Sequence, residues 1–232
     1  MKGLNDKTIV VSVGGSLIVP DEIDVHWLGR FREVVGRYTE DGYRFVVVAG
    51  GGRTARKYQE AARRLTDLED EDVDWIGIHS TRLNAHLLRA VFRDKAKYRI
   101  IKDPTEETDF KESVLIAAGW KPGFSTDYIA VLLAKNLGIK KLANLTNTDY
   151  VYDKDPHKNP DAKPIREIPW EDFRKLVGDR WDPGLNTPFD PIASREAEEY
   201  GMEVAILNGD LENFEEYLSG RNFKGTLIGC EY

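Results

Sequence analysis

Short apolar runs that end in glycines and lead into helical patterns constrain this chain most strongly. The runs at residues 8–13 and 43–49 both stop at glycine turns, and apolar residues then recur at helical spacing over 25–38 and after residue 53. A switch from strand-like to helix-like periodicity, repeated along a chain, is typical of strand–helix–strand units. We therefore expect an α/β fold with a largely parallel sheet covered on both faces.

The same alternation continues to the end of the chain. Further strands are expected at 98–101, 113–118, 141–145, 203–207 and 225–228. Further helices are expected at 75–93, after residue 125, near 170–177, near 190–200 and at 213–218, with 67–74 as an acidic loop. No repeat or linker divides the sequence. We expect one domain over 1–232, with lobes 1–119 and 120–232 meeting near residue 119.

Composition narrows the functional classes. Hydrophobic residues make up 41% of 232, enough for a packed core, and the net charge of −7 argues against a general nucleic-acid surface. Cys230 is the sole cysteine, and the histidines lack metal-site spacing, so neither a disulfide nor a structural zinc site is expected. No signal pattern and no long apolar run is present. We expect a cytoplasmic protein without a membrane or nucleic-acid partner.

Three glycine-containing turns are candidate phosphate sites. They lie at 14–16, at 50–52 and over 119–127, each at the carboxyl end of an expected strand. Glycine lets an anion approach the backbone, and the first amides of a following helix can bind it. Neither of the two standard nucleotide-binding glycine fingerprints is present. Each turn alone is equally consistent with simple chain reversal, whereas three together favour phosphate binding.

Three cations occupy an unfavourable position after the second turn. Arg53, Arg56 and Lys57 fall in the first turns of a helix, whose amino end is partially positive. Either a multiply charged anion sits there, or these side chains form a solvated basic face. The charge pattern favours the anion.

The third turn and a later acidic segment leave alternatives open. Ser125, Thr126 and Asp127 either cap the next helix or bind a transferred phosphoryl group, with Asp127 orienting the reacting groups. Lys121 lies in the same turn. In TNTDYVYDKDP (146–156) the aspartates are turn formers or site residues, and Tyr152 is a surface aromatic or a platform for a base.

Together these stretches resemble the amino acid kinase superfamily and, within it, the archaeal-type uridylate kinases. The resemblance runs through five ordered motifs, with a weaker sixth at 189–210: VVSVGGSLIVP (10–20), VVVAGGGRTARKY (46–58), DWIGIHSTRLNAHLL (74–88), GFSTDYIAVLLA (123–134) and LTNTDYVYDKDPHKNPDAKPI (145–165). It implies a three-layer αβα sandwich, usually a homohexamer, that transfers phosphate from ATP to UMP with Mg²⁺.

The resemblance also implies site residues. Gly15 and Ser16 would contact the ATP phosphates, Gly51 would lie against UMP, and Gly52 and Arg56 against ATP. Asp74 matches the acid that binds the acceptor ribose. The acceptor-binding loop would comprise Lys121, Pro122, Gly123, Phe124, Ser125, Thr126 and Asp127. The adenosine side would comprise Thr146, Asn147, Tyr152 and Asp155. Arg56 and Asp127 are the expected catalytic residues, and no protein metal ligand is expected, because Mg²⁺ would be held through nucleotide phosphates.

Departures from the pattern motivate alternatives. Ser12 stands where many members carry a lysine, a feature shared with the archaeal subgroup, and Tyr150 replaces a glycine of the usual VDGVY. Residues 180–188 also differ and receive no role. The alternatives are a related kinase for a carboxylate, carbamate or isoprenoid phosphate, and a nucleotide-binding sensor without turnover.

Overall fold

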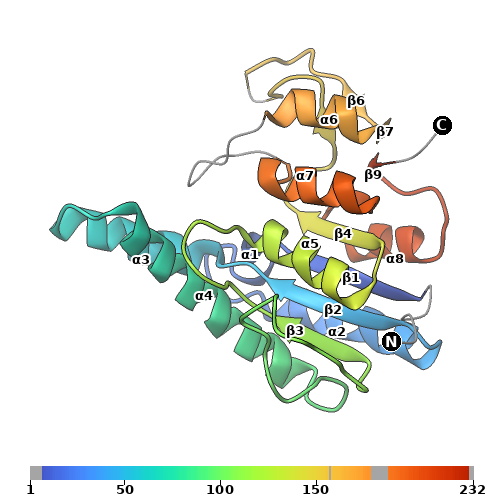
Figure 1. The fold of residues 1–232 in the computed structure, drawn as a ribbon, viewed down its shortest axis with the longest axis horizontal. Coiled ribbons are helices and arrows are strands. Elements are labelled where there is room, and N and C mark those ends of the chain that lie inside the picture. Colours follow the sequence, from blue (N-terminus) through green and yellow to red (C-terminus); the bar gives the residue numbers. More distant parts are fainter. Residues whose placement is uncertain (1–6, 157, 179–187, 230–232) are drawn as a thin grey trace.

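The computed structural model describes residues 7–156, 158–178 and 188–229. Within them a seven-stranded sheet has the order β3-β2-β1-β4-β8-β9-β7 (Figure 1). Its strands are β1 (Thr8–Val13), β2 (Arg44–Ala49), β3 (Val114–Ala117), β4 (Lys141–Thr146), β7 (Glu167–Ile168), β8 (Glu203–Asn208) and β9 (Gly225–Ile228). Every neighbouring pair is parallel except β8 and β9, so the predicted mainly parallel sheet is confirmed.

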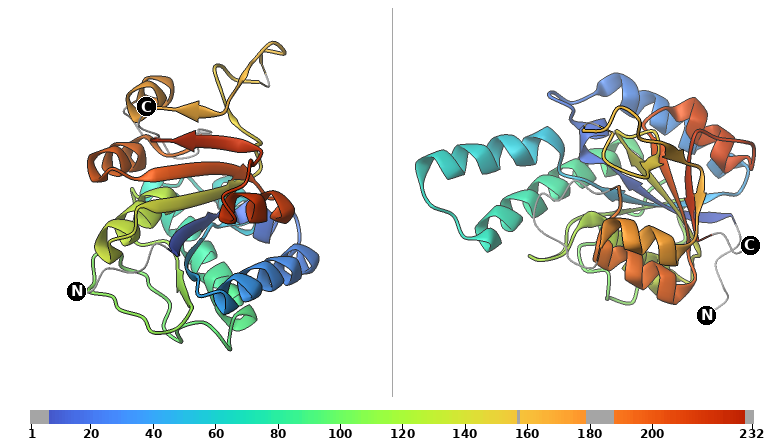
Figure 2. Two further views of the ribbon diagram at one scale, coloured as in Figure 1. Left: turned by 90° about the vertical axis from the view of Figure 1, so that its right-hand side faces the viewer. Right: turned by 90° about the horizontal axis from the view of Figure 1, so that it is seen from above.

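Helices cover both faces of this sheet. They are α1 (Gly15–Ile18), α2 (Val25–Glu40), α3 (Gly52–Leu65), α4 (Asp70–Val91), α5 (Thr126–Leu137), α6 (Trp170–Val177), α7 (Pro191–Tyr200) and α8 (Leu211–Leu218). Alternate strand residues enter two separate cores: Val11 packs on the side of α2, α4 and α8, whereas Val10 packs on the side of α5, α6 and α7 (Figure 2). This arrangement is the predicted three-layer αβα sandwich.

The order in which the strands are added to the sheet reverses between β1 and β4. Strands β2 and β3 extend the sheet on one side of β1, whereas β4 and β8 extend it on the other. In open α/β sheets ligands bind beyond the carboxyl ends of the strands at such a switch point. The arrowheads of β2 and β4 in Figure 1 point toward the side where α3 and α4 project.

Several local expectations were wrong. The acidic segment is not a loop up to residue 74: α4 begins at Asp70 and carries three acidic residues in its first turn, where the helix dipole favours them. The expected strand at 98–101 is reduced to isolated bridges at Ala96 and Ile101. The helical stripe expected after residue 53 comprises Ala55, Tyr58, Ala62 and Leu65, but Tyr58 and Leu65 are exposed, because α3 packs mainly on α4 and not on the sheet.

The sequence patterns did not predict two short strands between α5 and α6. A two-stranded sheet pairs β5 (Val151–Tyr152) with β6 (Pro164–Ile165) in antiparallel orientation. Two-residue strands are too short to show a period, so nothing in the sequence marked them. No helix in the described part of the chain is both long and apolar enough to cross a membrane.

Candidate active site

Two glycine turns touch each other at the switch point. A Cβ added to Gly15 would lie 1.9 Å from the Gly52 nitrogen, so no side chain fits there. Gly52 itself has φ of +65°, a conformation that L-residues rarely adopt. The amide of Gly14 donates to the Leu145 carbonyl at 2.7 Å, which ties the first turn to the end of β4. The expected turn at 14–16 is a single helical turn, α1, whose amides face the second glycine turn.

A buried asparagine holds the second turn in place. The Asn84 amide, 3% exposed, donates to the carbonyls of Gly50 at 2.8 Å and Gly51 at 3.1 Å. Sequence reasoning missed this residue. The available signal was a single amide within the apolar pattern of α4, a position at which a polar group requires a buried partner.

The three cations of α3 do not act as one group. Lys57 lies 3.1 Å and Arg53 3.7 Å from the Asp21 carboxylate, so this chain neutralises two of them itself. In the described residues the Arg56 guanidinium forms neither an ion pair nor a hydrogen bond. It lines a cavity instead. The argument from three cations to one anion was therefore wrong for Arg53 and Lys57 and applies to Arg56 alone.

That cavity, of about 230 Å³, lies between α3, α4 and the loop before α5. It brings together six of the residues predicted for nucleotide binding: Gly51, Gly52, Arg56, Asp74, Phe124 and Thr126. Gly119, from the third candidate phosphate turn, also lines it, and five further lining residues carried no functional prediction: Ala55, Gln59, Gly77, Ile78 and Thr81. Lining residues come from both sides of residue 119, so the cavity spans the expected lobe boundary.

The loop before α5 is fastened to α4. The Gly123 amide donates to the Asp74 carboxylate at 2.7 Å, and the Gly119 amide donates to the Thr81 hydroxyl at 2.7 Å. The Arg82 guanidinium donates to the carbonyls of Gly119 at 3.2 Å and Trp120 at 2.7 Å. Asp74 is thus a loop anchor and a cavity residue at once, within α4 and not before it as expected.

Other residues of this loop have structural partners outside the cavity. The Lys121 ammonium lies 4.0 Å from the centre of the Trp120 ring, a cation–π contact. Ser125 caps α5 by accepting from the Tyr128 amide at 3.1 Å, which is the capping role considered from the sequence. Lys121, Pro122, Gly123, Ser125 and Asp127 are not among the described lining residues.

Asp127 occupies the junction between β1 and the two helices α5 and α7. The buried Ser12 hydroxyl donates to its Oδ1 at 3.2 Å, and the Asp190 amide donates to its Oδ2 at 3.3 Å. Burial and, secondarily, the neighbouring Asp190 carboxylate raise the pKa of Asp127 to about 7. A carboxyl group with a strongly raised pKa, bonded to the strand that leads into the first glycine turn, is typical of a functional site.

The residues predicted for the adenosine side follow β4. Thr146 ends this strand, its hydroxyl lies 3.4 Å from the Asn147 side-chain oxygen, and Tyr152 belongs to β5. Asp155 follows β5 and lies 3.7 Å from the Lys158 ammonium.

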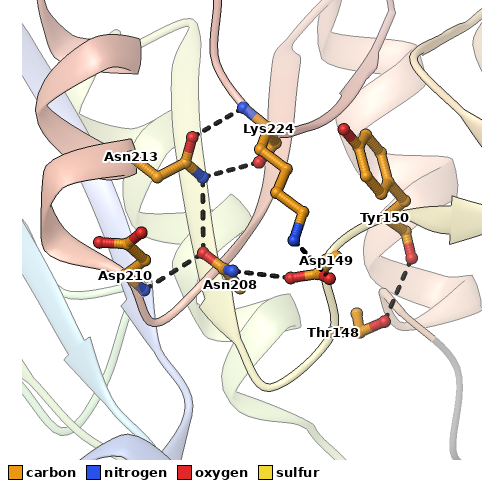
Figure 3. A network of polar contacts seen from close by, with 7 residues as sticks. All are labelled: Thr148, Asp149, Tyr150, Asn208, Asp210, Asn213 and Lys224. Carbon is orange, nitrogen blue, oxygen red and sulfur yellow. Dashed lines mark hydrogen bonds and ion pairs between the residues drawn. The ribbon is translucent and has the colours of Figure 1, made fainter.

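A polar network fixes the segment between them (Figure 3). Asp149 accepts from the Lys224 ammonium and from the Asn208 amide, both at 2.7 Å, and the hydrogen bond from Lys224 lowers the pKa of Asp149. Asn213 in turn donates to the Lys224 carbonyl at 2.7 Å. Sequence reasoning had left Asp149 as either a turn former or a site residue; its contacts make it an anchor of this loop to β8 and β9.

The two departures from the family pattern have local explanations. Ser12 is the hydrogen-bond donor to Asp127, so the lysine position serves a different contact here. Tyr150 needs no glycine conformation, because no described non-glycine residue has a positive φ, and its carbonyl accepts from Thr148 at 3.2 Å. Of the segment 180–188, all but Pro188 lies outside the described residues, as do His157 and Cys230.

Comparison with known proteins identifies the family. Residues 7–208 match the amino acid kinase family, and the chain therefore belongs to it, as its motifs predicted. The chain is 35% identical over 224 residues to the uridylate kinase of Thermococcus sibiricus, covering 95% of this chain and 98% of that protein. It is 33% identical to the uridylate kinase of Pyrococcus abyssi, with the same coverage. The crystal structure of uridylate kinase from Archaeoglobus fulgidus matches with a TM-score of 0.82 at 29% identity, covering 95% and 99% of the two chains.

Proposed function

We propose that this protein phosphorylates UMP to UDP at the expense of ATP, as a step of pyrimidine nucleotide synthesis. One observation carries the proposal: a cavity beyond the carboxyl ends of β2 and β3 is lined by Arg56, whose guanidinium has no partner among the described residues, and by Asp74, which is anchored to the loop before α5. The uridylate kinases of Thermococcus sibiricus and Pyrococcus abyssi match this chain over nearly their whole length, which supports the same reaction here.

In this proposal UMP occupies the cavity between α3 and α4. Asp74 accepts hydrogen bonds from the ribose hydroxyls, and the UMP phosphate lies against Gly51 and the Arg56 guanidinium. ATP lies beyond β1 and β4, with its phosphates at Gly15, Ser16 and Gly52 and its adenosine near Thr146, Asn147, Tyr152 and Asp155. The two glycine turns are in contact, so donor and acceptor phosphates meet where they touch.

The reaction then needs positioning more than covalent chemistry. A UMP phosphate oxygen attacks the γ-phosphorus in line, the bond to the ADP oxygen breaks, and no covalent intermediate forms with the protein. Arg56 offsets the negative charge on the transferred group. Asp127 orients the reacting groups, held by Ser12 and by the Asp190 amide.

The residues of this site suit Mg²⁺ only if the nucleotide phosphates supply most of its ligands. In the described residues no cluster of three or more potential ligands exists, and a Mg²⁺ ion that bridges phosphates needs at most one or two carboxylates from the protein. The ion, when bound, would neutralise phosphate charge. A cytoplasmic homohexamer completes the proposal, as the resemblance to the family implies.

An acceptor panel tests the proposal. A coupled assay with ATP and Mg²⁺ would compare UMP, CMP, dUMP, acetylglutamate, carbamate and isopentenyl phosphate. The proposal predicts the highest kcat/KM with UMP. Preference for a carboxylate, carbamate or isoprenoid phosphate would replace it with the related-kinase hypothesis. Binding of ATP and UMP without UDP formation would favour the sensor.

A further inference from the structure

A second cavity opens at the opposite end of the same strands. It also measures about 230 Å³ and lies at the amino ends of β1, β4 and β8, where Lys7, Lys141 and Glu203 stand. The candidate active site lies at the carboxyl ends, about 20 Å away for strands of this length. The end of α8 and the chain that leads into β9 contribute Leu218, Gly220, Arg221 and Phe223 to its lining. Nothing in the proposed reaction uses this cavity.

One part of its wall is apolar and partly aromatic. It comprises Ile9, Tyr43, Leu218, Phe223 and Leu227. The Phe223 ring packs edge-on against the Tyr217 ring at 5.2 Å, and Tyr43 packs edge-on against Tyr38 at 5.1 Å, so both aromatic walls are held in place. Fixed apolar walls of this kind fit a flat organic body.

Tyr217 supplies the specific polar feature. Its hydroxyl is buried and has no hydrogen-bond partner among the described residues. Burial and the nearby Glu203 carboxylate raise the pKa of Tyr217, so the phenol remains a neutral donor. Buried hydroxyls are nearly always paired, so an unpaired one on a residue that lines a cavity indicates an acceptor supplied from outside the chain.

The charges around the cavity favour an acceptor that is negatively charged. Lys7, Lys141 and Arg221 line it against the single carboxylate of Glu203. Arg221 is paired with Glu216, and the Lys7 ammonium donates to the Asp41 carbonyl at 2.8 Å. The Lys141 ammonium has no hydrogen bond or ion pair within the described part of the chain. The cavity therefore offers one unused ammonium and one unused buried phenol.

We propose that this second cavity binds a small organic anion with a flat apolar body. Its charged oxygen would accept from Lys141 and Tyr217, and its body would lie on Leu218, Phe223 and Leu227. The site is separate from the one that binds nucleotides, and its occupation does not depend on the proposed reaction.

A pair of fluorescent probes tests the assignment. 8-Anilinonaphthalene-1-sulfonate carries the anion, and N-phenyl-1-naphthylamine is the same molecule without the sulfonate. Both would be titrated into the full chain with UMP and ATP present in excess. We expect saturable binding of one equivalent of the sulfonate, weakened about tenfold by Lys141→Ala, since a hydrogen bond to a charged group is lost. The uncharged probe should bind the wild type and this variant equally.

Two further variants keep the test decisive. Tyr217→Phe removes only the unpaired hydroxyl, so it should fold normally and still weaken the sulfonate probe. Lys102→Ala, at an exposed lysine elsewhere, is the matched control and should change neither probe. The proposal is overturned if Lys141→Ala and Tyr217→Phe leave the sulfonate affinity unchanged, if the uncharged probe loses as much affinity, or if the added nucleotides displace the sulfonate.

Discussion

Asp127→Asn gives the sharpest test of the electrostatics at the site. The wild-type carboxyl has a pKa of about 7 in place of 3.8, so the folded protein holds a proton that the unfolded chain releases. Asparagine has nearly the same shape and stays neutral. It can still accept from the Asp190 amide, while its own amide donates to the Ser12 hydroxyl, which serves as donor or acceptor.

The sign follows from proton linkage. Below pH 3.8 both states of the wild type are protonated, and the raised pKa leaves its stability intact. As the pH rises toward 7, the unfolded chain is increasingly favoured because only it ionises freely. The difference between a pKa of 3.8 and one of about 7, at about 1.4 kcal/mol for each pH unit, limits the gain in unfolding free energy to about 4 kcal/mol. Because Asp127 is only half-buried, we expect about 1–3 kcal/mol after screening by water.

Urea unfolding of both proteins from pH 4.5 to 8 measures this difference. Groups other than Asp127 titrate alike in the two proteins and cancel. We expect Asp127→Asn to gain stability over the wild type steadily as the pH rises and to level off above neutrality, while its kcat falls. A stability difference that does not change with pH would refute the assignment of a raised pKa to this carboxyl.

Three other substitutions, with Arg53→Ala as a control, probe separate parts of the site. Arg56→Ala should lower kcat/KM at least about tenfold, or roughly 1.4 kcal/mol, whereas Arg53→Ala, which removes a cation paired with the chain, should have little effect. Asn84→Ala removes the side-chain donor to the buried Gly50 carbonyl and should lower the free energy of unfolding by about 1–3 kcal/mol, measured in urea. Lys224→Met frees Asp149 and should raise the KM for ATP about threefold or more while leaving the KM for UMP unchanged, in steady-state assays.

Each of these outcomes can fail in a distinct way. Equal losses for Arg56→Ala and Arg53→Ala would mean that α3 contributes a diffuse basic face. Full stability of Asn84→Ala would mean that water replaces the amide at the glycine turn. Parallel changes in both KM values for Lys224→Met would mean that the Asp149 network supports the fold as a whole and not the adenosine side.

The sequence predicted the features of the fold that repeat with a clear period. Strands such as β1 and β2 are buried on both faces and end at glycines, so their apolar runs were visible without a structure. The start of α4 was misplaced because its first turn is acidic and exposed, a pattern that also fits a loop. The hairpin of β5 and β6 has no period to detect.

The site was predictable where one short motif carries it, and not where distant segments meet. The glycine turns and Arg56 lie within single stretches of sequence. The contact of Ser12 with Asp127 joins residues 115 positions apart, and Asn84 reaches the glycine turn from another helix. Such pairings depend on the tertiary fold. The partners of Arg53 and Lys57 likewise come from the loop before α2, which carried no signal of its own.

A crystal structure with UMP and a non-hydrolysable ATP analogue tests the central claim most directly. The account predicts UMP in the cavity between α3 and α4, with its ribose at Asp74, its phosphate at Arg56, and Asp127 beside the two facing phosphates. UMP bound elsewhere, or bound in this cavity with its phosphate turned away from the glycine turns, would contradict it.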